Sequence, residues 1–178
     1  MKKINIKVKR VKRIGAVDAR PIRIIHSLDG ILDPLDTQKV LKVIRCLSKK
    51  IDWKNVDYVV GFDSGGIIPS VFLSFVNKKP LLIAYKLNLD LPHRIKFLEP
   101  HAVKKDIYIY GLKRGNRVVL VDDEIYSGDS MVEAIKELQK GGIIIKDIVC
   151  LIEAVKLGAR NKIRKFGFNL KSYLKHNF

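Results

Sequence analysis

The sequence predicts an α/β fold built on a doubly wound, mostly parallel sheet. Several short apolar runs rich in β-branched residues occur along the chain, and such runs are typical of strands that helices cover on both faces. The main runs are followed by a loop and then by a helical pattern, which is the order of a parallel βα unit. The clearest unit is the strand 117–121, which leads through a polar loop to helical apolar positions. These positions are Met131, Ala134, Ile135 and Leu138.

The first part of the chain predicts two short strands and a helix. Residues 1–20 alternate weakly between apolar and polar, as in a short strand or a loose basic arm, and 22–25 is a second short strand. After a turn-rich stretch, Asp36 is an expected N-cap for a helix that runs to about Lys50. Its expected apolar face is Val40, Leu41, Val43, Ile44, Leu47 and Ile51.

The middle of the chain predicts two further strands and a long excursion. Residues 56–62 form a strand, the Asp-Ser-Gly-Gly turn at 63–66 leads into a helix, and 80–85 is a third buried strand ending at Lys86. Two glycines after a strand indicate either a tight turn or close approach of a ligand. Residues 88–111 lack a buried pattern, so we expect them to leave the sheet as a lid-sized segment.

The last part of the chain completes the predicted sheet. Two glycines at 141–142 end the helix that follows the strand at 117–121, and 143–152 supplies another buried strand. Residues 156–166 predict a short basic helix, and 169–174 predicts a final edge strand. We therefore expect one domain that covers residues 1–178.

Composition limits the classes of function. No apolar run reaches the length of a membrane helix, and no signal-peptide pattern follows the basic segment 1–13. Cys46 and Cys150 show no metal-ligand spacing, so we expect a cytoplasmic protein with no membrane partner. The net charge of +17 gathers at the ends, where 1–13 and 156–178 each hold seven Lys or Arg and no acid. This charge indicates attraction to a polyanion or a lysine-rich, solvated surface.

The stretch 117–131 carries the clearest chemistry. Asp122 and Asp123 follow the apolar strand, and Ser127, Gly128 and Ser130 precede the helix. A helix N-terminus offers unpaired N–H groups that bind phosphate, and the hydroxyls add donors. The acidic pair is placed to accept hydrogen bonds from sugar hydroxyls. Together these groups describe a ribose 5-phosphate site, whereas the alternative is an ordinary strand–loop–helix unit with Ser130 as N-cap.

Residues 119–131 resemble the phosphoribosyl-pyrophosphate (PRPP) signature of type I phosphoribosyltransferases. The resemblance implies that Asp122 and Asp123 hold the ribose hydroxyls. It implies that the loop residues bind the 5-phosphate of PRPP, namely Tyr126, Ser127, Gly128, Asp129 and Ser130. Many members have glycine where this chain has Asp129. A carboxylate about 4 Å from a phosphate costs about 4 kcal/mol at a dielectric near 20, so we expect the Asp129 side chain to point away.

The resemblance extends to other segments and implies further roles. Residues 63–66 are similar to the pyrophosphate loop of the family, and the expected pyrophosphate ligands are Asp63, Ser64, Gly65, Gly66 and Lys86. Glu99 resembles a loop glutamate that assists proton movement on the base in adenine enzymes. The family also implies a small hood from about 1–35 and 154–178, a flexible lid at about 88–111, and a homodimer. Mg²⁺ is the implied cofactor, held mainly by substrate and not directly by protein ligands.

The implied activity is purine salvage, in which a purine base displaces pyrophosphate from PRPP to give the nucleoside monophosphate. Gly30 and Ile31 are followed by Leu-Asp-Pro at 32–34 instead of the Phe-Arg-Asp of adenine enzymes, and 25–31 resembles archaeal-type hypoxanthine/guanine enzymes. Glu99 favours adenine instead, and orotate and uracil are less favoured. The rival function is a PRPP-sensing regulator on the same fold, which binds nucleic acid. Tyr126 and the charge of +17 favour that rival.

Overall fold

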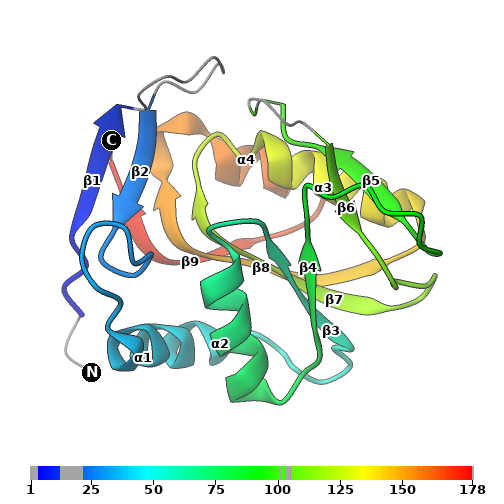
Figure 1. The fold of residues 1–178 in the computed structure, drawn as a ribbon, viewed down its shortest axis with the longest axis horizontal. Helices are drawn as coiled ribbons and strands as arrows, with labels where there is room; N and C mark the ends of the chain where they lie inside the picture. Colours follow the sequence, from blue (N-terminus) through cyan, green and yellow to red (C-terminus); the bar gives the residue numbers. More distant parts are fainter. Residues whose placement is uncertain (1–3, 13–21, 101, 103–105, 178) are drawn as a thin grey trace.

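A parallel sheet of five strands forms the centre of the molecule, in the order β4-β3-β7-β8-β9 (Figure 1). The computed structural model describes residues 4–12, 22–100, 102 and 106–177. The strands are β3 (Tyr58–Phe62), β4 (Leu81–Ala84), β7 (Arg117–Ile125), β8 (Ile144–Ala154) and β9 (Leu170–His176). The predicted parallel α/β fold is confirmed, because every neighbouring pair in this sheet is parallel.

Helices cover both faces of the sheet because its central strands are apolar on both sides. Val118 and Leu120 of β7 belong to one core, and Val119 and Val121 belong to the other. This division follows from the alternation of side chains along a strand. Helices α1 (Thr37–Ser48) and α2 (Ile67–Asn77) lie against one face. Helices α3 (Asp129–Lys140) and α4 (Ala159–Arg164) lie against the other, and the 3-10 turn Val155–Leu157 precedes α4 (Figure 1).

Helix α1 shows how local signals set the element ends. Asp36 accepts a hydrogen bond from the Lys39 backbone N–H at 3.0 Å, which is the geometry of an N-cap. The predicted apolar face is buried at Val40, Val43, Ile44 and Leu47. The predicted start and face of this helix are therefore confirmed.

A separate two-stranded sheet stands beside the main one and forms the hood. Strand β1 (Val8–Lys12) pairs antiparallel with β2 (Ile22–His26), which settles the choice between a strand and a loose arm for this segment. Residues 1–3 and 13–20 of the segment expected to alternate lie outside the described residues. The C-terminal segment expected in the hood lies instead in the main sheet, where β9 pairs with β8 at the edge. It meets the N-terminal segment at the Tyr173 hydroxyl, which accepts from the Ile4 N–H at 3.4 Å.

Two expectations about burial need correction. Strand β4 lies at the edge of the sheet, so only Ala84 is fully buried within it. Residues 88–111 contain an antiparallel hairpin of β5 (Ile95–Leu98) and β6 (Asp106–Ile109), and Phe97, Ile107 and Ile109 enter the core. The expected absence of a buried pattern in this segment is wrong. Residues 101 and 103–105 lie outside the described part of the chain, and the flexible lid remains a prediction.

The topology has a switch point between β3 and β7, and we call the region outside the carboxyl ends of these two strands the crevice. From β3 the chain passes through α2 to β4 on one side, and from β7 it passes through α3 to β8 on the other side. Ligands in open α/β sheets bind where strand order reverses in this way, outside the carboxyl ends of the strands. The boundary between β3 and β7 is therefore the expected binding edge. No helix in the described ranges is long and apolar enough to cross a membrane.

Candidate active site

The acidic pair lies where β7 loses one of its two neighbours. Pairing of β7 with β3 ends at Val121, while pairing with β8 continues to Ile125. The strand therefore does not end at the carboxylates, as the sequence suggested, because β8 extends beside it. The edge of β7 that faced β3 is open from Asp122 onward. This opening places both carboxylates at the crevice.

Asp122 and Asp123 occupy different environments although they are adjacent. Successive side chains of a strand point to opposite faces, and the Asp123 backbone N–H donates to Asp122 Oδ1 at 2.9 Å. Asp122 keeps some exposure to solvent, yet desolvation, followed by repulsion from Asp123, raises its pKa well above the usual value. Asp123 is buried. The pair thus combines a carboxyl that holds its proton readily with a neighbouring acceptor.

Asp123 lies between the loop after β3 and the hood. A Cβ atom on Gly65 would meet the Asp123 carboxylate at 2.2 to 2.3 Å, so only glycine fits beside it. On another side, Nε2 of His26 lies 3.9 Å from Asp123 Oδ2. Burial lowers the pKa of His26, and the charge of Asp123 opposes this shift. The structure therefore joins the predicted acidic pair directly to the predicted pyrophosphate loop.

The loop 63–66 connects β3 to α2 at the crevice. The Asp63 N–H donates to the Ala84 carbonyl at 3.0 Å, which ties the loop to β4, and the Asp63–Ser64 peptide bond is cis. Gly66 is the N-cap of α2, and no side chain caps that helix. The first N–H groups of a helix lack intrahelical acceptors, so this end can bind an anion.

The loop before α3 offers two further donors. Ser127 Oγ and Ser130 Oγ are buried, and neither has a hydrogen-bond partner within the described part of the chain. Gly128, not Ser130, is the N-cap of α3, and it adopts the left-handed conformation with φ 78°. The expectation that Ser130 caps this helix, which belonged to the alternative of an ordinary strand–loop–helix unit, is therefore wrong. Buried hydroxyls are nearly always hydrogen-bonded, so this pair indicates a ligand with acceptor oxygens.

Asp129 stands where many members of the family have glycine, and its side chain has a partner. Lys162 Nζ of α4 lies 2.5 Å from Asp129 Oδ1. The carboxylate charge is thereby compensated next to the loop. The sequence did not indicate Lys162, because its only signal was its place in a basic helix.

Lys86 and Glu99 were predicted for different roles and lie in contact. Lys86 follows β4, Glu99 follows β5, and the Lys86 Nζ–Glu99 Oε2 distance is 2.6 Å. Their side chains are 28% and 21% exposed, so the pair is partly open to solvent. The bridge between Tyr85 and Tyr108 brings the end of β4 to the hairpin, which explains the contact.

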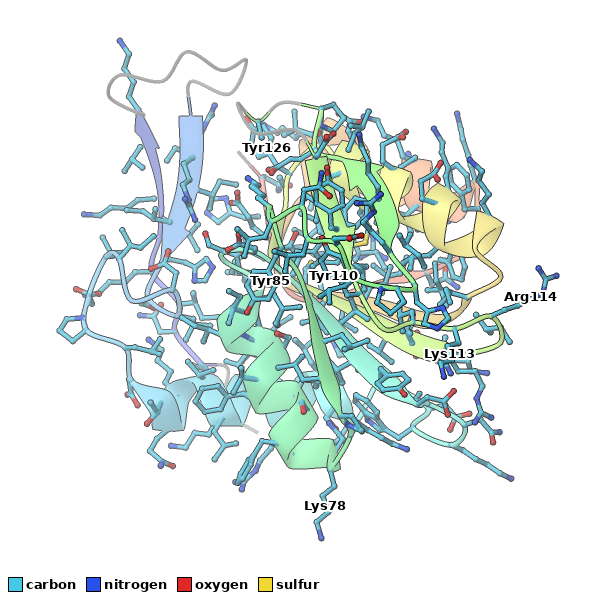
Figure 2. All side chains as sticks on the ribbon, turned by 45° about the vertical axis from the view of Figure 1, so that its right-hand side comes forward. Lys78, Tyr85, Tyr110, Lys113, Arg114 and Tyr126 are labelled. Atoms are coloured by element: carbon cyan, nitrogen blue, oxygen red, sulfur yellow. The ribbon has the colours of Figure 1, made fainter. Side chains whose placement is uncertain are left out.

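Tyr126, the remaining predicted phosphate-loop residue, is half-buried and lies at the turn between β7 and α3 (Figure 2). No group of three or more His, Cys, Asp or Glu in the described ranges could hold a metal ion. The two carboxylates at the crevice are oxygen donors, which fit Mg²⁺ bound chiefly through substrate phosphates and water.

Comparisons with known proteins agree with this geometry. A hypoxanthine/guanine phosphoribosyltransferase of Methanocaldococcus infernus is 34% identical over 154 residues, which cover 85% of this chain and 82% of that protein. A protein of the same name from Methanotorris igneus is 34% identical over 160 residues, with coverage of 85% and 82%. No protein-family model matches the chain.

Solved structures share the fold at low sequence identity. The adenine phosphoribosyltransferase of Giardia lamblia, in complex with 9-deazaadenine, aligns with a TM-score of 0.75 and 19% identity, covering 96% of this chain and 94% of that one. The adenine phosphoribosyltransferase of Rhodothermus marinus aligns with a TM-score of 0.74 and 19% identity, covering 95% and 94%.

Proposed function

Because this chain belongs to the type I purine phosphoribosyltransferase family, we propose that it transfers ribose 5-phosphate from PRPP to hypoxanthine or guanine. The products are the nucleoside monophosphate and pyrophosphate, as in purine salvage. The observation that carries the proposal is the crevice itself. Among the described residues the buried Ser127 and Ser130 hydroxyls have no hydrogen-bond partner, and they lie between β7 and the first turn of α3. Asp123 contacts the Gly65 loop at the same edge of the sheet.

Each part of the crevice matches one part of PRPP. The loop from Tyr126 to Ser130 and the start of α3 would bind the 5-phosphate through N–H and hydroxyl donors. Asp122 and Asp123 would accept hydrogen bonds from the ribose hydroxyls. Loop 63–66 at the start of α2 would bind the pyrophosphate, together with Lys86. In this order C1 of the ribose would lie between the two helix ends.

The reaction needs positioning and electrostatic stabilisation more than a protein nucleophile. A purine nitrogen forms a bond to C1 while the bond from C1 to the pyrophosphate oxygen breaks, and the base loses a proton. Positive charge develops on the ribose ring as the leaving group departs. The Asp123 carboxylate would stabilise that charge. When bound, Mg²⁺ would neutralise the pyrophosphate.

The contact between Lys86 and Glu99 gives both residues a role in this scheme. Pyrophosphate would compete with Glu99 for the Lys86 ammonium, because charge-assisted hydrogen bonds to phosphate are strong. A freed Glu99 would be available to accept the proton that the base loses. As the expected lid, segment 88–111 would exclude water from the crevice.

The deciding experiment measures pyrophosphate release from PRPP and Mg²⁺. Adenine, hypoxanthine, guanine, xanthine, uracil and orotate are supplied one at a time. We expect release with hypoxanthine or guanine. Release with adenine alone would overturn the base assignment, and no release with any base would overturn the enzyme proposal.

A second candidate is a PRPP-sensing regulator that binds nucleic acid. The net charge of +17 favours it. The enzyme is preferred because the described crevice presents both loops, Lys86 and Glu99 together. PRPP binding without turnover, measured by calorimetry, would favour the regulator.

We further propose a homodimer in a reducing cytoplasm, consistent with two free cysteines, Cys46 and Cys150. Exposed apolar side chains on α2, Val71 and Phe75, offer a surface for self-association. Sedimentation velocity at micromolar concentration tests this proposal, and a single monomer boundary would contradict it.

A further inference from the structure

His26 is a buried titratable residue to which the proposed reaction assigns no role. It ends strand β2 of the hood, and none of its surface is exposed. Its Nε2 has no hydrogen-bond partner within residues 4–12, 22–100, 102 and 106–177. A buried N–H without an acceptor costs free energy, so an unpaired group in this place requires an explanation.

The ring orientation fixes which nitrogen carries the proton. Nδ1 accepts a hydrogen bond from the Leu28 backbone N–H at 3.2 Å. A nitrogen that accepts must present its lone pair, so in the neutral ring the proton lies on Nε2. The donor that lacks a partner is therefore Nε2–H.

The turn after β2 holds the ring in this orientation. Asp29 Oδ2 accepts from the His26 backbone N–H at 2.7 Å, and Asp29 Oδ1 accepts from the Ile31 N–H at 2.7 Å. Both ends of the turn are thus fixed by one carboxylate. The backbone that carries the imidazole is thereby held in place, and a rotation of the ring would break its Nδ1 bond to the Leu28 N–H.

The nearest charged acceptor to Nε2 is the crevice carboxylate. Nε2 lies 3.9 Å from Asp123 Oδ2, which is beyond the range of about 2.7 to 3.2 Å for a direct hydrogen bond. On another side of Asp123, Gly65 leaves no room for the carboxylate to retreat. A movement of about 1 Å toward the hood would form the bond, and catalytic hydrogen bonds are often long before substrate binds.

We propose that His26 is a positioning residue for Asp123. When PRPP binds, Nε2–H donates to Asp123 Oδ2 and leaves the other carboxylate oxygen directed at a ribose hydroxyl. His26 is fully buried, so it acts through Asp123 and does not touch the substrate. The inference rests on the proposed function, because it needs Asp123 to contact the ribose.

Two substitutions separate this role from a structural one. His26→Asn keeps an acceptor near the Nδ1 position for the Leu28 N–H but removes the donor at the Nε2 position. His26→Gln keeps a donor near the Nε2 position but removes the acceptor near Nδ1. Calorimetry gives the Kd for PRPP with Mg²⁺, and thermal unfolding gives the melting temperature of each protein.

PRPP affinity and melting temperature should rank the two variants in opposite orders. We expect His26→Asn to bind PRPP about tenfold more weakly than wild type, as for loss of one charge-assisted hydrogen bond, while its melting temperature stays above that of His26→Gln. His26→Gln should recover most of the lost affinity. Equal affinity of wild type and His26→Asn would overturn the inference, as would equal loss in both variants.

A measurement on the wild-type chain covers the case in which a variant does not fold. The chain has four histidines, so their ¹⁵N imidazole resonances are few. We expect His26 to be protonated at Nε2 and its Nε2–H proton to move downfield when PRPP is added, as the bond to Asp123 shortens. An unchanged resonance at saturating PRPP would overturn the inference. Failure of the wild-type chain to bind PRPP would instead overturn the proposed function.

Discussion

Asp123 joins several parts of the crevice. Its carboxylate faces His26 of the hood and Gly65 of the loop after β3, and its backbone N–H is fixed by Asp122. A carboxylate packed against Gly65 and within reach of the His26 ring is placed to accept a hydrogen bond and to stabilise developing positive charge.

The first prediction concerns Asp123→Asn. The substitution keeps the size of the side chain but removes its negative charge, so the fold should survive. We expect PRPP affinity and turnover both to fall by roughly 10- to 100-fold, as for loss of a hydrogen bond to a charged group. Steady-state kinetics and calorimetry measure the two effects. The matched control is Asp52→Asn, because Asp52 is exposed and caps the Lys54 N–H far from the crevice. Unchanged turnover in Asp123→Asn would contradict the proposed role of Asp123 in the reaction.

The second prediction concerns Gly65→Ala. The new Cβ would lie within 2.3 Å of the Asp123 carboxylate, so the carboxylate or the loop must move. A displacement of this size costs about 100-fold in rate when positioning carries the catalysis. The control is Gly141→Ala, where φ is −70° and the nearest atom is the flexible tip of Ile95 at 3.2 Å. Pyrophosphate release should fall in the first variant and persist in the second. Equal activity of the two would show that the contact with Asp123 is dispensable.

The residue types of the site could be read from the sequence, but their contacts could not. The patterns at 63–66 and 122–130 identify both loops because each depends on neighbours in the chain. The contacts of His26 with Asp123, of Lys162 with Asp129, and of Lys86 with Glu99 join segments that only the folded topology brings together.

At the scale of elements, a buried ion pair joins β8, α4 and β9. Arg160 donates to Glu153 at 2.5 and 2.8 Å and to the Leu170 carbonyl at 2.7 Å, and the Ser172 hydroxyl donates to Glu153 at 2.6 Å. Glu153 is 1% exposed. The pair therefore fixes the end of the sheet on which α4 packs.

The third prediction concerns Arg160→Ala. The substitution leaves Glu153 buried without its cation, and removing one partner of a buried pair costs about 3 to 5 kcal/mol of folding free energy. Chemical denaturation at pH 7 measures the loss. The control is Lys136→Ala on α3, whose pair with Glu133 is exposed and contributes a few tenths of a kcal/mol. A loss below about 1 kcal/mol in Arg160→Ala would show that water replaces the missing partner.

The same pair sets a fourth prediction, on pH. Burial alone would raise the pKa of Glu153, but hydrogen bonds from Arg160 and Ser172 and the charge of Arg160 outweigh it, so the pKa lies below its usual value. A carboxyl with a lowered pKa stabilises the fold above its unfolded pKa, and this contribution is lost as the pH falls through the folded pKa. In Arg160→Ala, burial without the cation should raise the pKa instead. We therefore expect the stability gap between variant and wild type to narrow from pH 7 to pH 4. If the stability difference between wild type and Arg160→Ala widens on acidification, Arg160 does not lower the pKa of Glu153.

Elements differed in how well their sequence predicted them. Helix α1 and strand β8 follow from local periodicity, so their existence and position could be predicted. The hairpin of β5 and β6 could not, because its four-residue strands include the charged residues Lys96 and Asp106, and its burial depends on packing of β5 on α3 and of β6 on β4. Strand β4 was expected to be buried because an apolar run does not reveal whether a second strand lies beside it.

For the whole molecule, the topology determines where the candidate site lies, whereas the charge determines a general attraction to polyanions. The parallel direction of the five strands could be inferred from the βα pattern, and it brings the loops 63–66 and 126–130 to one edge of the sheet. Positive side chains gather at the two ends of the chain, and further ones lie on the surface between them. Figure 2 shows Lys78 and Arg114 pointing into solvent on loops away from Tyr126. Charge of this kind produces attraction to any polyanion and carries no specificity.

The fifth prediction follows from that distribution. At low salt the chain should bind labelled RNA or DNA oligonucleotides, because a net charge of +17 releases counterions from nucleic acid. Binding should fall steeply with salt, reaching a Kd of about 10⁻⁴ to 10⁻⁶ M at physiological ionic strength, and it should not depend on sequence. Fluorescence anisotropy measures this affinity across a salt series. The series is run with PRPP, and the control series contains sodium sulfate at equal ionic strength instead. If the crevice serves only the transfer reaction, PRPP and sulfate should weaken oligonucleotide binding to the same extent. A change specific to PRPP, or a preference for one sequence, would couple the crevice to the basic surface and favour the regulator.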